Sequence, residues 1–288
     1  MNSKKVIIAT HNAKFHADDV FSIVILKKVF GNIEVVRTRE EDLLKKADFR
    51  VDVGGKYNHE TKDYDHHQEG SPVRNNRVPY AACGLVWKHY GRKLVNSEKA
   101  FDYVDEKLIQ YSDSIDSGVE LEKGEVYNLS IGEAVEMFGS NWNEDKTNDE
   151  CFNEAVDFAF LFFERLLVKV NSVLEGEKDV DKCLIEMKDN LVILSRPRLP
   201  KGKLCDSSAK IYIESNNVGT WVAVGVPIKP KSFIRKIYFP DSWAGLLDEE
   251  LERASGIKGL TFCHKHKFII VGKTKKAVLE ASKLAQKN

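Results

Sequence analysis

The sequence predicts an α/β protein with two domains. A doubly wound, mainly parallel sheet is expected over residues 1–150, and a smaller, basic α/β domain with its connecting helices over residues 151–288. Two observations support this. Apolar strand-like runs alternate with helical segments in the first half, as in folds with a parallel sheet. After residue 190 closely spaced strands follow, with five of the seven prolines between residues 197 and 240.

Three apolar runs of the first half have the length of buried strands, and helical patterns separate them. The first helix ends at Gly31, a residue type favoured just after a helix. A polar loop is expected from residue 54 to 79. In chain order, the predicted strands are 5–10, 33–38 and 49–55, and the predicted helices are 17–31, 40–47, 79–91 and 97–116.

The second half begins after a polar stretch at residues 139–149. A long helix is expected at 151–175, and its strongly apolar body is assigned to core packing. Further helices are expected at 245–255 and 275–286. The predicted strands are 190–195, 209–215, 221–226, 234–239, 259–263 and 267–272.

The composition is that of a folded intracellular protein. The 288 residues are 42% hydrophobic, which allows one large core or two medium ones. No run approaches the roughly 20 apolar residues of a membrane span, and the N-terminal run lacks a signal-peptide cleavage site. We therefore expect a cytoplasmic protein without a membrane partner. The five cysteines form no Cys-x-x-Cys pair, so free thiols are expected.

A net charge of zero hides an uneven distribution of charge. Residues 100–160 hold sixteen acidic residues against three lysines, whereas residues 196–236 hold nine basic residues against two acidic ones. An acidic first half suits cations, and a basic second half suits an anionic ligand. Solvated helix faces would give the same asymmetry, so the charges alone do not decide the function.

Polar side chains that can bind metals follow the predicted strands, which is where open parallel sheets bind ligands. Imidazole and carboxylate groups without cysteine are typical ligands of Mn, Fe, Co or Zn. The candidates outnumber the ligands of one ion, so we expect two ions that share a bridging carboxylate. The candidates are His11, His16, Asp18, Asp19, Asp52, Asp65, His66, His67, Asp113 and Asp116.

Asp52 is the expected bridge, because a carboxylate in an apolar strand is costly to bury unless it is paired or coordinated. Each candidate taken alone also has a structural explanation. His16 could cap the following helix, and Asp18 could favour the positive end of that helix. Asp-His-His is a short motif with a high false-positive rate. Their joint position on one predicted rim favours a metal site.

Asp65-His66-His67, with the strand aspartate and the N-terminal His/Asp motif, resembles the DHH phosphoesterase superfamily. The closer resemblance is to the Myg (melanocyte proliferating gene) family of DHH-type exonucleases, and it covers nearly the whole chain. The motifs that carry it are THNAKFHADD, VVRTRE, VDVGGKY, YDHHQ, DSIDSG, NWN, FPDSWAGLLDEELERASGIKG and CHKHKFI.

The resemblance implies a site for two divalent ions, with Mn favoured over Mg, Co, Fe or Zn. It implies that Asp65 orients a ligand histidine and that His67 faces the substrate as a catalytic group. Asn12 and Asp19 would support the site, and Asp113 would support it or replace Asp116. One ion would be held by His11, His16 and Asp52, and the other by Asp18, Asp52, His66 and Asp116.

The chain departs from the superfamily pattern in two ways. His16 stands where much of the superfamily has a carboxylate, and the second domain lacks a Gly-Gly-Gly-His loop. Substrate contacts are therefore sought among the basic residues of the second domain, where His264 is favoured over His266. Trp243 could stack on a base, although core packing is the stronger alternative. The expected substrate-binding residues are Lys231, Arg235, Trp243 and His264.

The sequence thus predicts a metal-dependent phosphodiesterase, in which one ion activates water as hydroxide for attack at phosphorus in a cleft between the two domains. The resemblance implies a 3′–5′ exoribonuclease acting on RNA or short oligoribonucleotides. A phosphatase for a nucleotide or pyrophosphate is one alternative, and a non-catalytic, metal-stabilised RNA-binding protein is another. A homo-oligomer is compatible with the sequence.

Overall fold

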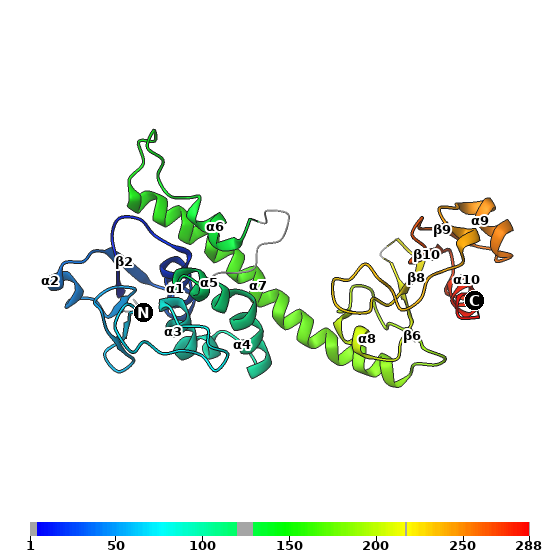
Figure 1. Cartoon of the computed structure of the whole chain (residues 1–288), viewed down its shortest axis with the longest axis horizontal. Coiled ribbons are helices and arrows are strands. Elements are labelled where there is room, and N and C mark those ends of the chain that lie inside the picture. Colours follow the sequence, from blue (N-terminus) through cyan, green and yellow to red (C-terminus); the bar gives the residue numbers. More distant parts are fainter. Residues whose placement is uncertain (1–4, 120–128, 217, 288) are drawn as a thin grey trace. The chain divides into compact units, whose positions relative to one another are not determined.

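The computed structural model describes residues 5–119, 129–216 and 218–287 (Figure 1). The chain forms two compact units, residues 1–171 and 172–288. The division lies inside the long helix α7 (Asn148–Ile185) and not at residue 150 as expected. The reason is that the first part of α7 packs on the first unit, where Phe152 contacts Phe15 and Phe163 contacts Trp87.

The first unit contains a five-stranded sheet in the order β2-β1-β3-β5-β4. Its first three neighbouring pairs are parallel, and only the β4–β5 pair is antiparallel. The mainly parallel sheet predicted from the sequence is therefore confirmed. The strands are β1 (Val6–Thr10), β2 (Ile33–Arg37), β3 (Phe49–Val51), β4 (Tyr57–Asn58) and β5 (Asp63–Tyr64).

Helices lie on both faces of this sheet. The connections β1–α1–β2 and β2–α2–β3 run in opposite directions, because β2 and β3 lie on opposite sides of β1. Right-handed crossovers in opposite directions place α1 (Ala17–Phe30) and α2 (Glu41–Leu44) on opposite faces. Leu44 accordingly packs with Ala9 of β1. The strand order thus changes direction between β1 and β3.

The polar segment expected as a loop at 54–79 contains β4 and β5. They escaped prediction because each is two residues long and Asp63 is polar. Arg50 of β3 pairs with Asp63, and the buried Tyr64 stacks on Phe49. The next helices of the unit are α3 (Ala82–Tyr90), α4 (Glu98–Val104), α5 (Gln110–Asp116) and α6 (Ile131–Glu136), with short turns η1 (Gly91–Lys93) and the π-helical η2 (Asp105–Ile109).

The second unit has a five-stranded sheet in the order β6-β7-β8-β10-β9. Only β6 and β7 are parallel, and the other pairs are antiparallel. Its strands are β6 (Leu191–Ile193), β7 (Ile211–Ser215), β8 (Trp221–Gly225), β9 (Leu260–Cys263) and β10 (Ile269–Gly272). Its other elements are α8 (Gly202–Asp206), η3 (Asp241–Trp243), α9 (Asp248–Ser255) and α10 (Lys275–Ala285).

The strand predicted at residues 234–239 is wrong. This segment makes only an isolated bridge from Arg235 to Pro227, and Pro227 has no N–H with which to extend a ladder. The segment instead folds over β8, where a Cβ on Gly225 would lie 2.4 Å from the carbonyl oxygen of Ile237. Glycine is thus required by this close approach.

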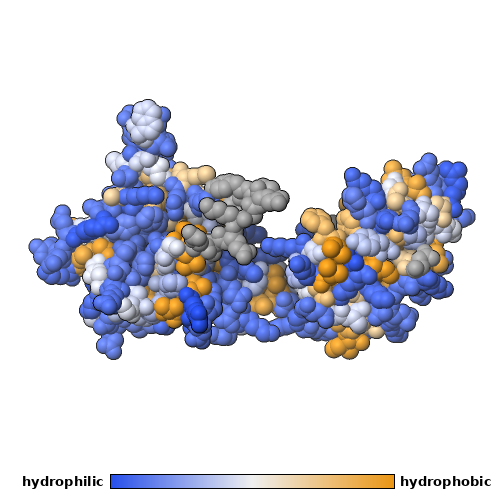
Figure 2. All heavy atoms as spheres, viewed as in Figure 1, coloured by the Kyte–Doolittle hydropathy of each residue, from blue (hydrophilic) through white to orange (hydrophobic). Residues whose placement is uncertain are grey.

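The surfaces of the two units differ in hydropathy. Figure 2 shows hydrophilic side chains over most of the visible face of the first unit and larger hydrophobic patches on that of the second. Exposed apolar side chains of the second unit include Phe233, which is 91% exposed, and Ile234. All five cysteines are free and buried, as predicted. Among the described residues, no helix has both the length and the apolar character needed to cross a membrane.

Candidate metal centre

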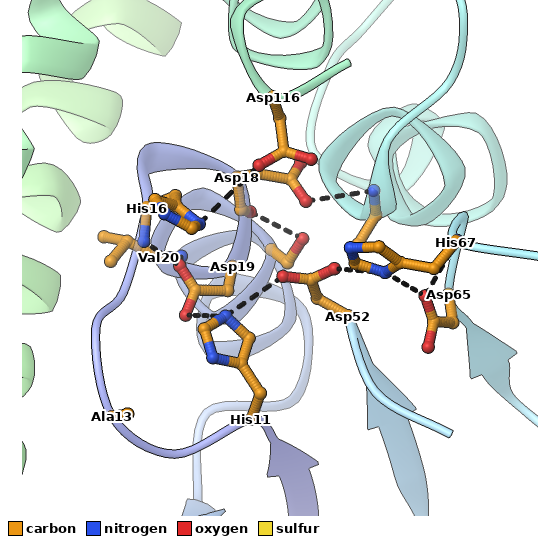
Figure 3. Close-up of polar contacts among 12 residues, drawn as sticks. His11, Ala13, His16, Asp18, Asp19, Val20, Asp52, Asp65, His67 and Asp116 are labelled. Carbon is orange, nitrogen blue, oxygen red and sulfur yellow. Dashed lines mark hydrogen bonds and ion pairs between the residues drawn. The ribbon is translucent and has the colours of Figure 1, made fainter. Parts of the chain in front are cut away.

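Histidine and aspartate side chains converge at the carboxyl ends of three adjacent strands of the first unit (Figure 3). His11 follows β1 directly, Asp52 follows β3, and Asp65 follows β5. The point between β1 and β3 is where the strand order changes direction, so the loops leaving these strands diverge and leave a crevice. The short, unpredicted β5 is what brings the Asp-His-His motif to the same rim.

Asp52 is the centre of the cluster. Its Oδ2 lies 3.1 Å from Nε2 of His11, and its Oδ1 lies 3.4 Å from Nε2 of His66. The side chain is buried, and the backbone φ of +53° is in the left-handed region, which costs energy for a residue other than glycine. The strand end therefore holds one carboxylate so that each oxygen faces a different histidine, as a bridging ligand requires.

Asp116 closes the other side of the cluster from the end of α5. Its Oδ2 lies 2.8 Å from Nε2 of His66, and its Oδ1 lies 3.7 Å from Nδ1 of His16. His16 is the N-cap residue of α1, so the capping role weighed for it is present together with the position beside Asp116. The rings of His11 and His16 are 6.0 Å apart.

Asp18 and Asp19 begin α1 and anchor the cluster to the fold. Both oxygens of Asp18 accept backbone N–H groups of α3, from Ala82 at 3.1 Å and Cys83 at 2.8 Å. Asp18 still has an oxygen close enough to His66 and Asp116 to share an ion with them. Oδ1 of Asp19 accepts the N–H of His16 at 2.9 Å, and its Oδ2 lies 3.3 Å from Nε2 of His11.

The side chain of Asp65 orients His67. Its Oδ1 accepts Nδ1–H of His67 at 2.7 Å, and its Oδ2 accepts the N–H of Gly55 at 2.7 Å. To His66 it is bonded only through the backbone N–H. The side chain of His67 is 64% exposed, and no residue in the described ranges bonds to its Nε2. His66 thus faces the carboxylates of Asp52 and Asp116, whereas His67 faces solvent, a difference that the sequence suggested.

Asn12 and Asp113 support the site in ways that the structure specifies. The backbone oxygen of Asn12 accepts Nδ1–H of His11 at 3.0 Å, which turns Nε2 of His11 toward Asp52. Asp113 accepts the N–H of Gly84 at 2.8 Å and pairs with Arg74 at 2.6 Å. A side chain on Gly84 would collide with Asp113, so this contact joins α3 tightly to α5.

Three buried atoms of the cluster make no well-aligned hydrogen bond within the described residues, and each contacts only another ionisable group of the cluster. They are Oδ2 of Asp19, Oδ1 of Asp52 and Nε2 of His66. Among the described residues, three groups of ligand atoms are each compact enough for an ion. They are Asp52, His66 and His67; Asp18, His66 and Asp116; and the fully buried Asp18, Cys83 and Asp113.

The electrostatics of the cluster also favour a cation. Burial, with the carboxylates of Asp52 and Asp116 nearby, raises the pKa of Asp18 well above its usual value. Burial raises the pKa of Asp19 to about 7, although His11 opposes it. Burial lowers the pKa of His66, but Asp116 and Asp52 outweigh it and raise the pKa to about 11. These raised pKa values mean that the cluster holds protons where a divalent cation could bind in their place. The residues fit a metal.

The substrate-binding residues expected in the second unit lie in different surroundings. Trp243 is 3% exposed and packs with Phe239 in the core, so its indole offers no face to a base. Core packing, the alternative weighed for it, is what the structure shows. Lys231 is exposed, at a turn with φ of +63°.

Arg235 lines a cavity of about 550 Å³ in the second unit. His266 lines it too, whereas His264 lies behind, with its ring 4.4 Å from that of Phe268. The aromatic residues of the cavity were not predicted from the sequence. The run FIRKIYF, of which residues 234–239 were predicted to be a strand, indicated them by its spacing of aromatic and basic residues. The lining residues are Phe233, Arg235, Tyr238, Lys265, His266, Lys267 and Phe268.

Comparison with known proteins decides the family. The profile of MYG1_exonuc, described as "Uncharacterised protein family (UPF0160)", matches residues 7–287. The chain belongs to this family. It is 29% identical over 317 residues to the MYG1 protein C694.04c of Schizosaccharomyces pombe, with 97% of each chain covered. It is 28% identical over 324 residues to the MYG1 exonuclease of Homo sapiens, covering 98% of this chain and 86% of the human protein.

The match extends through both units, so the metal centre and the basic unit belong to one family pattern. A MYG1 protein of Saccharomyces cerevisiae is also 28% identical, over 96% of this chain and 95% of its own. No solved structure matches the chain. The resemblance to the Myg family drawn from the motifs is thus confirmed over nearly the whole length.

Proposed function

We propose that this protein is a metal-dependent phosphodiesterase with two divalent ions, of which Mn is the first choice, in a DHH-type domain. The observation that carries the proposal is Asp52, whose two oxygens face two different histidines at the strand switch point. His11, His16 and Asp52 would hold one ion. Asp18, Asp52, His66 and Asp116 would hold the other.

Bound ions of this kind supply an acidified water and neutralise the charge that develops on oxygens at phosphorus. The protein's own part is positioning. Asp65 fixes the ring of His67 through Nδ1, so that Nε2 points outward. With the ring protonated on both nitrogens, Nε2 would donate a hydrogen bond to a phosphate oxygen or give its proton to the leaving oxygen, a role that contributes about 10²- to 10⁴-fold in enzymes.

The proposed substrate is RNA or a short oligoribonucleotide, shortened from its 3′ end. The human, mouse and bovine relatives carry the name MYG1 exonuclease. The cavity of the second unit combines aromatic and cationic side chains, which is the pattern of surfaces that stack single-stranded bases and bind phosphates. Phe233, 91% exposed beside Arg235, is the side chain best placed for stacking.

The proposal is tested with Asp52→Asn and an oligoribonucleotide labelled at either end. The wild type, loaded with Mn²⁺, should release mononucleotides from the 3′ end. Asp52→Asn should lower the rate by about 10³-fold, since the ions' share of transition-state stabilisation is several kcal/mol. Asp42→Asn, a change of an exposed aspartate of the same unit, serves as the matched control and should leave the rate unchanged.

Two other outcomes would contradict the proposal. Turnover of mononucleotides or pyrophosphate without shortening of the oligomers would make the protein a small-molecule phosphatase. A rise of the melting temperature with Mn²⁺, but no turnover of any phosphate ester by the wild type, would make the metal structural.

A further inference from the structure

A second cavity, of about 900 Å³, opens beside the metal centre in the first unit. Asp52, Asp65 and His67 form part of its wall, so a molecule at the proposed ions would also occupy this space. Four cationic side chains form another part of the wall. They are Arg39, Lys45, Arg50 and Lys56.

Three of these four cations already have a carboxylate partner. Arg50 pairs with Asp63 and donates to the carbonyl oxygen of Ala47 at 2.8 Å. Lys45 pairs with Glu41 at 3.3 Å. Lys56, 56% exposed at its side chain, is 3.5 Å from Asp63, a carboxylate that Arg50 already engages. Arg50 is therefore fully engaged, whereas the pairs of Lys45 and Lys56 are exposed and weak, so these lysines supply positive charge without being held in place.

Arg39 differs from the others, because it makes no ion pair with any residue of the described ranges. Its Nη1 donates to the backbone oxygen of Asn12 at 2.9 Å and to the side-chain oxygen Oδ1 of Asn12 at 2.7 Å. No other hydrogen bond joins Arg39 to the residues that the structure describes. Asn12 thus fixes one corner of the planar guanidinium, and the edge formed by Nε and Nη2 stays free. A held guanidinium with a free edge is suited to bind a phosphate through two parallel bonds.

We propose that Arg39 anchors a phosphate subsite next to the metal centre, which binds the phosphate group adjacent to the one that is cleaved. This rests on the proposed function. It narrows the substrate to phosphodiester chains, or to esters with at least two phosphate groups, in which one phosphate lies at the ions and its neighbour at Arg39. Lys56 lies on the same wall and adds positive charge.

A purely structural role is the competing explanation, since Arg39 also holds the loop that carries His11. Arg37 provides the matched control for this role. Its Nη2 donates to the backbone oxygen of Ala13 at 2.6 Å, in the same loop. Its side chain is 3% exposed, pairs with Asp149 and does not line the cavity. Arg37 therefore supports the loop without access to a ligand.

The test compares Arg39→Ala with Arg37→Ala on two substrates. A trinucleotide has a phosphate beside the one cleaved, and bis(p-nitrophenyl) phosphate has none. Arg39→Ala should lower kcat/KM on the trinucleotide by about 10- to 100-fold, the loss expected for charge-assisted hydrogen bonds. On bis(p-nitrophenyl) phosphate it should change kcat/KM less than about twofold, and calorimetry should find the Mn²⁺ affinity unchanged. Arg37→Ala should affect both substrates equally, through loosening of the metal-binding loop.

The proposal is overturned if Arg39→Ala lowers kcat/KM equally on both substrates and also lowers the Mn²⁺ affinity. It is also overturned if Arg39→Ala leaves kcat/KM unchanged on both substrates. A failure of the proposed function gives a different result, in which the wild type hydrolyses neither substrate. In that case the binding of a fluorescent trinucleotide, measured by anisotropy, decides on the subsite. Weaker binding to Arg39→Ala than to Arg37→Ala supports it, and equal binding of the two variants rejects it.

Discussion

The two units of this protein each contain a sheet of five strands, but only one of the sheets gathers chemical groups at its end. In the first unit three neighbouring pairs are parallel, so β1, β3 and β5 end on the same side. His11, Asp52 and Asp65 follow these three ends. In the second unit three of the four pairs are antiparallel, and successive strand ends alternate between opposite edges. Strand direction thus decides which sheet can assemble a metal centre.

The polar groups of the two units differ accordingly. In the first unit Asp52 and His66 are buried and keep ligand atoms without hydrogen bonds within the described chain. In the second unit His266 and Arg235 line an open cavity with aromatic side chains. The first arrangement favours small cations, and the second favours planar, anionic ligands. Four predictions test this division of roles.

The largest effect is expected in the core of the second unit. Trp243→Ala should lower the stability of that unit by about 3–5 kcal/mol, because it removes a large buried side chain. Hydrogen exchange should show loss of protection after residue 172, with the Mn²⁺ affinity of the first unit unchanged. Trp221→Ala, a change of a half-buried tryptophan of the same unit, is the control with the smaller expected loss. Full stability combined with weaker oligonucleotide binding would restore the stacking role for Trp243.

The next effect separates the adjacent histidines. His66→Ala should lower the Mn²⁺ affinity by more than the roughly 100-fold known for residues that only support ligands. His67→Ala should keep the affinity and lower kcat by about 10²- to 10³-fold, since its Nδ1 is bonded to Asp65 and its Nε2 faces solvent. Calorimetry and single-turnover rates measure the two quantities. His264→Ala, in the second unit, should leave the Mn²⁺ affinity unchanged. A loss of Mn²⁺ affinity in this variant would contradict the division of roles between the two units.

The strands and the Asp-His-His motif could be predicted from the sequence, because apolar runs and motif residues are local signals. β5 could not, since it has only two residues, one of them the polar Asp63, and its place follows from pairing with β3. The partner of Asp65 also depends on turn geometry, which bends the backbone so that its carboxylate reaches His67. Arg39 was visible in a motif, but its free edge follows from the contact of Nη1 with Asn12 and from the lack of a carboxylate partner among the described residues, which are properties of the fold.

A smaller effect is expected from the aromatic cavity. Phe233→Ala should weaken the binding of a single-stranded oligonucleotide by about 1–3 kcal/mol, the usual contribution of one stacked base. Fluorescence anisotropy without metal measures this binding. Ile185→Ala removes another exposed apolar side chain of the same unit, outside the cavity, and should have no effect. Equal affinity of the two variants would show that the cavity does not bind bases.

The smallest effect concerns the pH dependence of the stability of the first unit. The rings of His59 and His89 stack at 3.7 Å, and Nε2 of His89 is 2.7 Å from the hydroxyl of Tyr57. Burial, with His59 and Lys88 nearby, lowers the pKa of His89 from 6.5 to about 4. The unfolded chain therefore binds more protons between these values, and stability should be complete above pH 6.5 and fall as the pH approaches 4.

His89 is only partly buried, so solvent screening should reduce its contribution to roughly 1 kcal/mol. His89→Phe keeps an aromatic ring against His59 but cannot titrate. Urea unfolding at pH 7 and pH 4.5 should show a smaller loss of stability for His89→Phe than for the wild type. His264→Phe, the matched change in the second unit, should retain the wild-type pH dependence of the first unit, because the proton linkage belongs to the stacked pair. The same pH dependence in His89→Phe would assign the acid sensitivity to the metal-binding carboxylates and histidines instead.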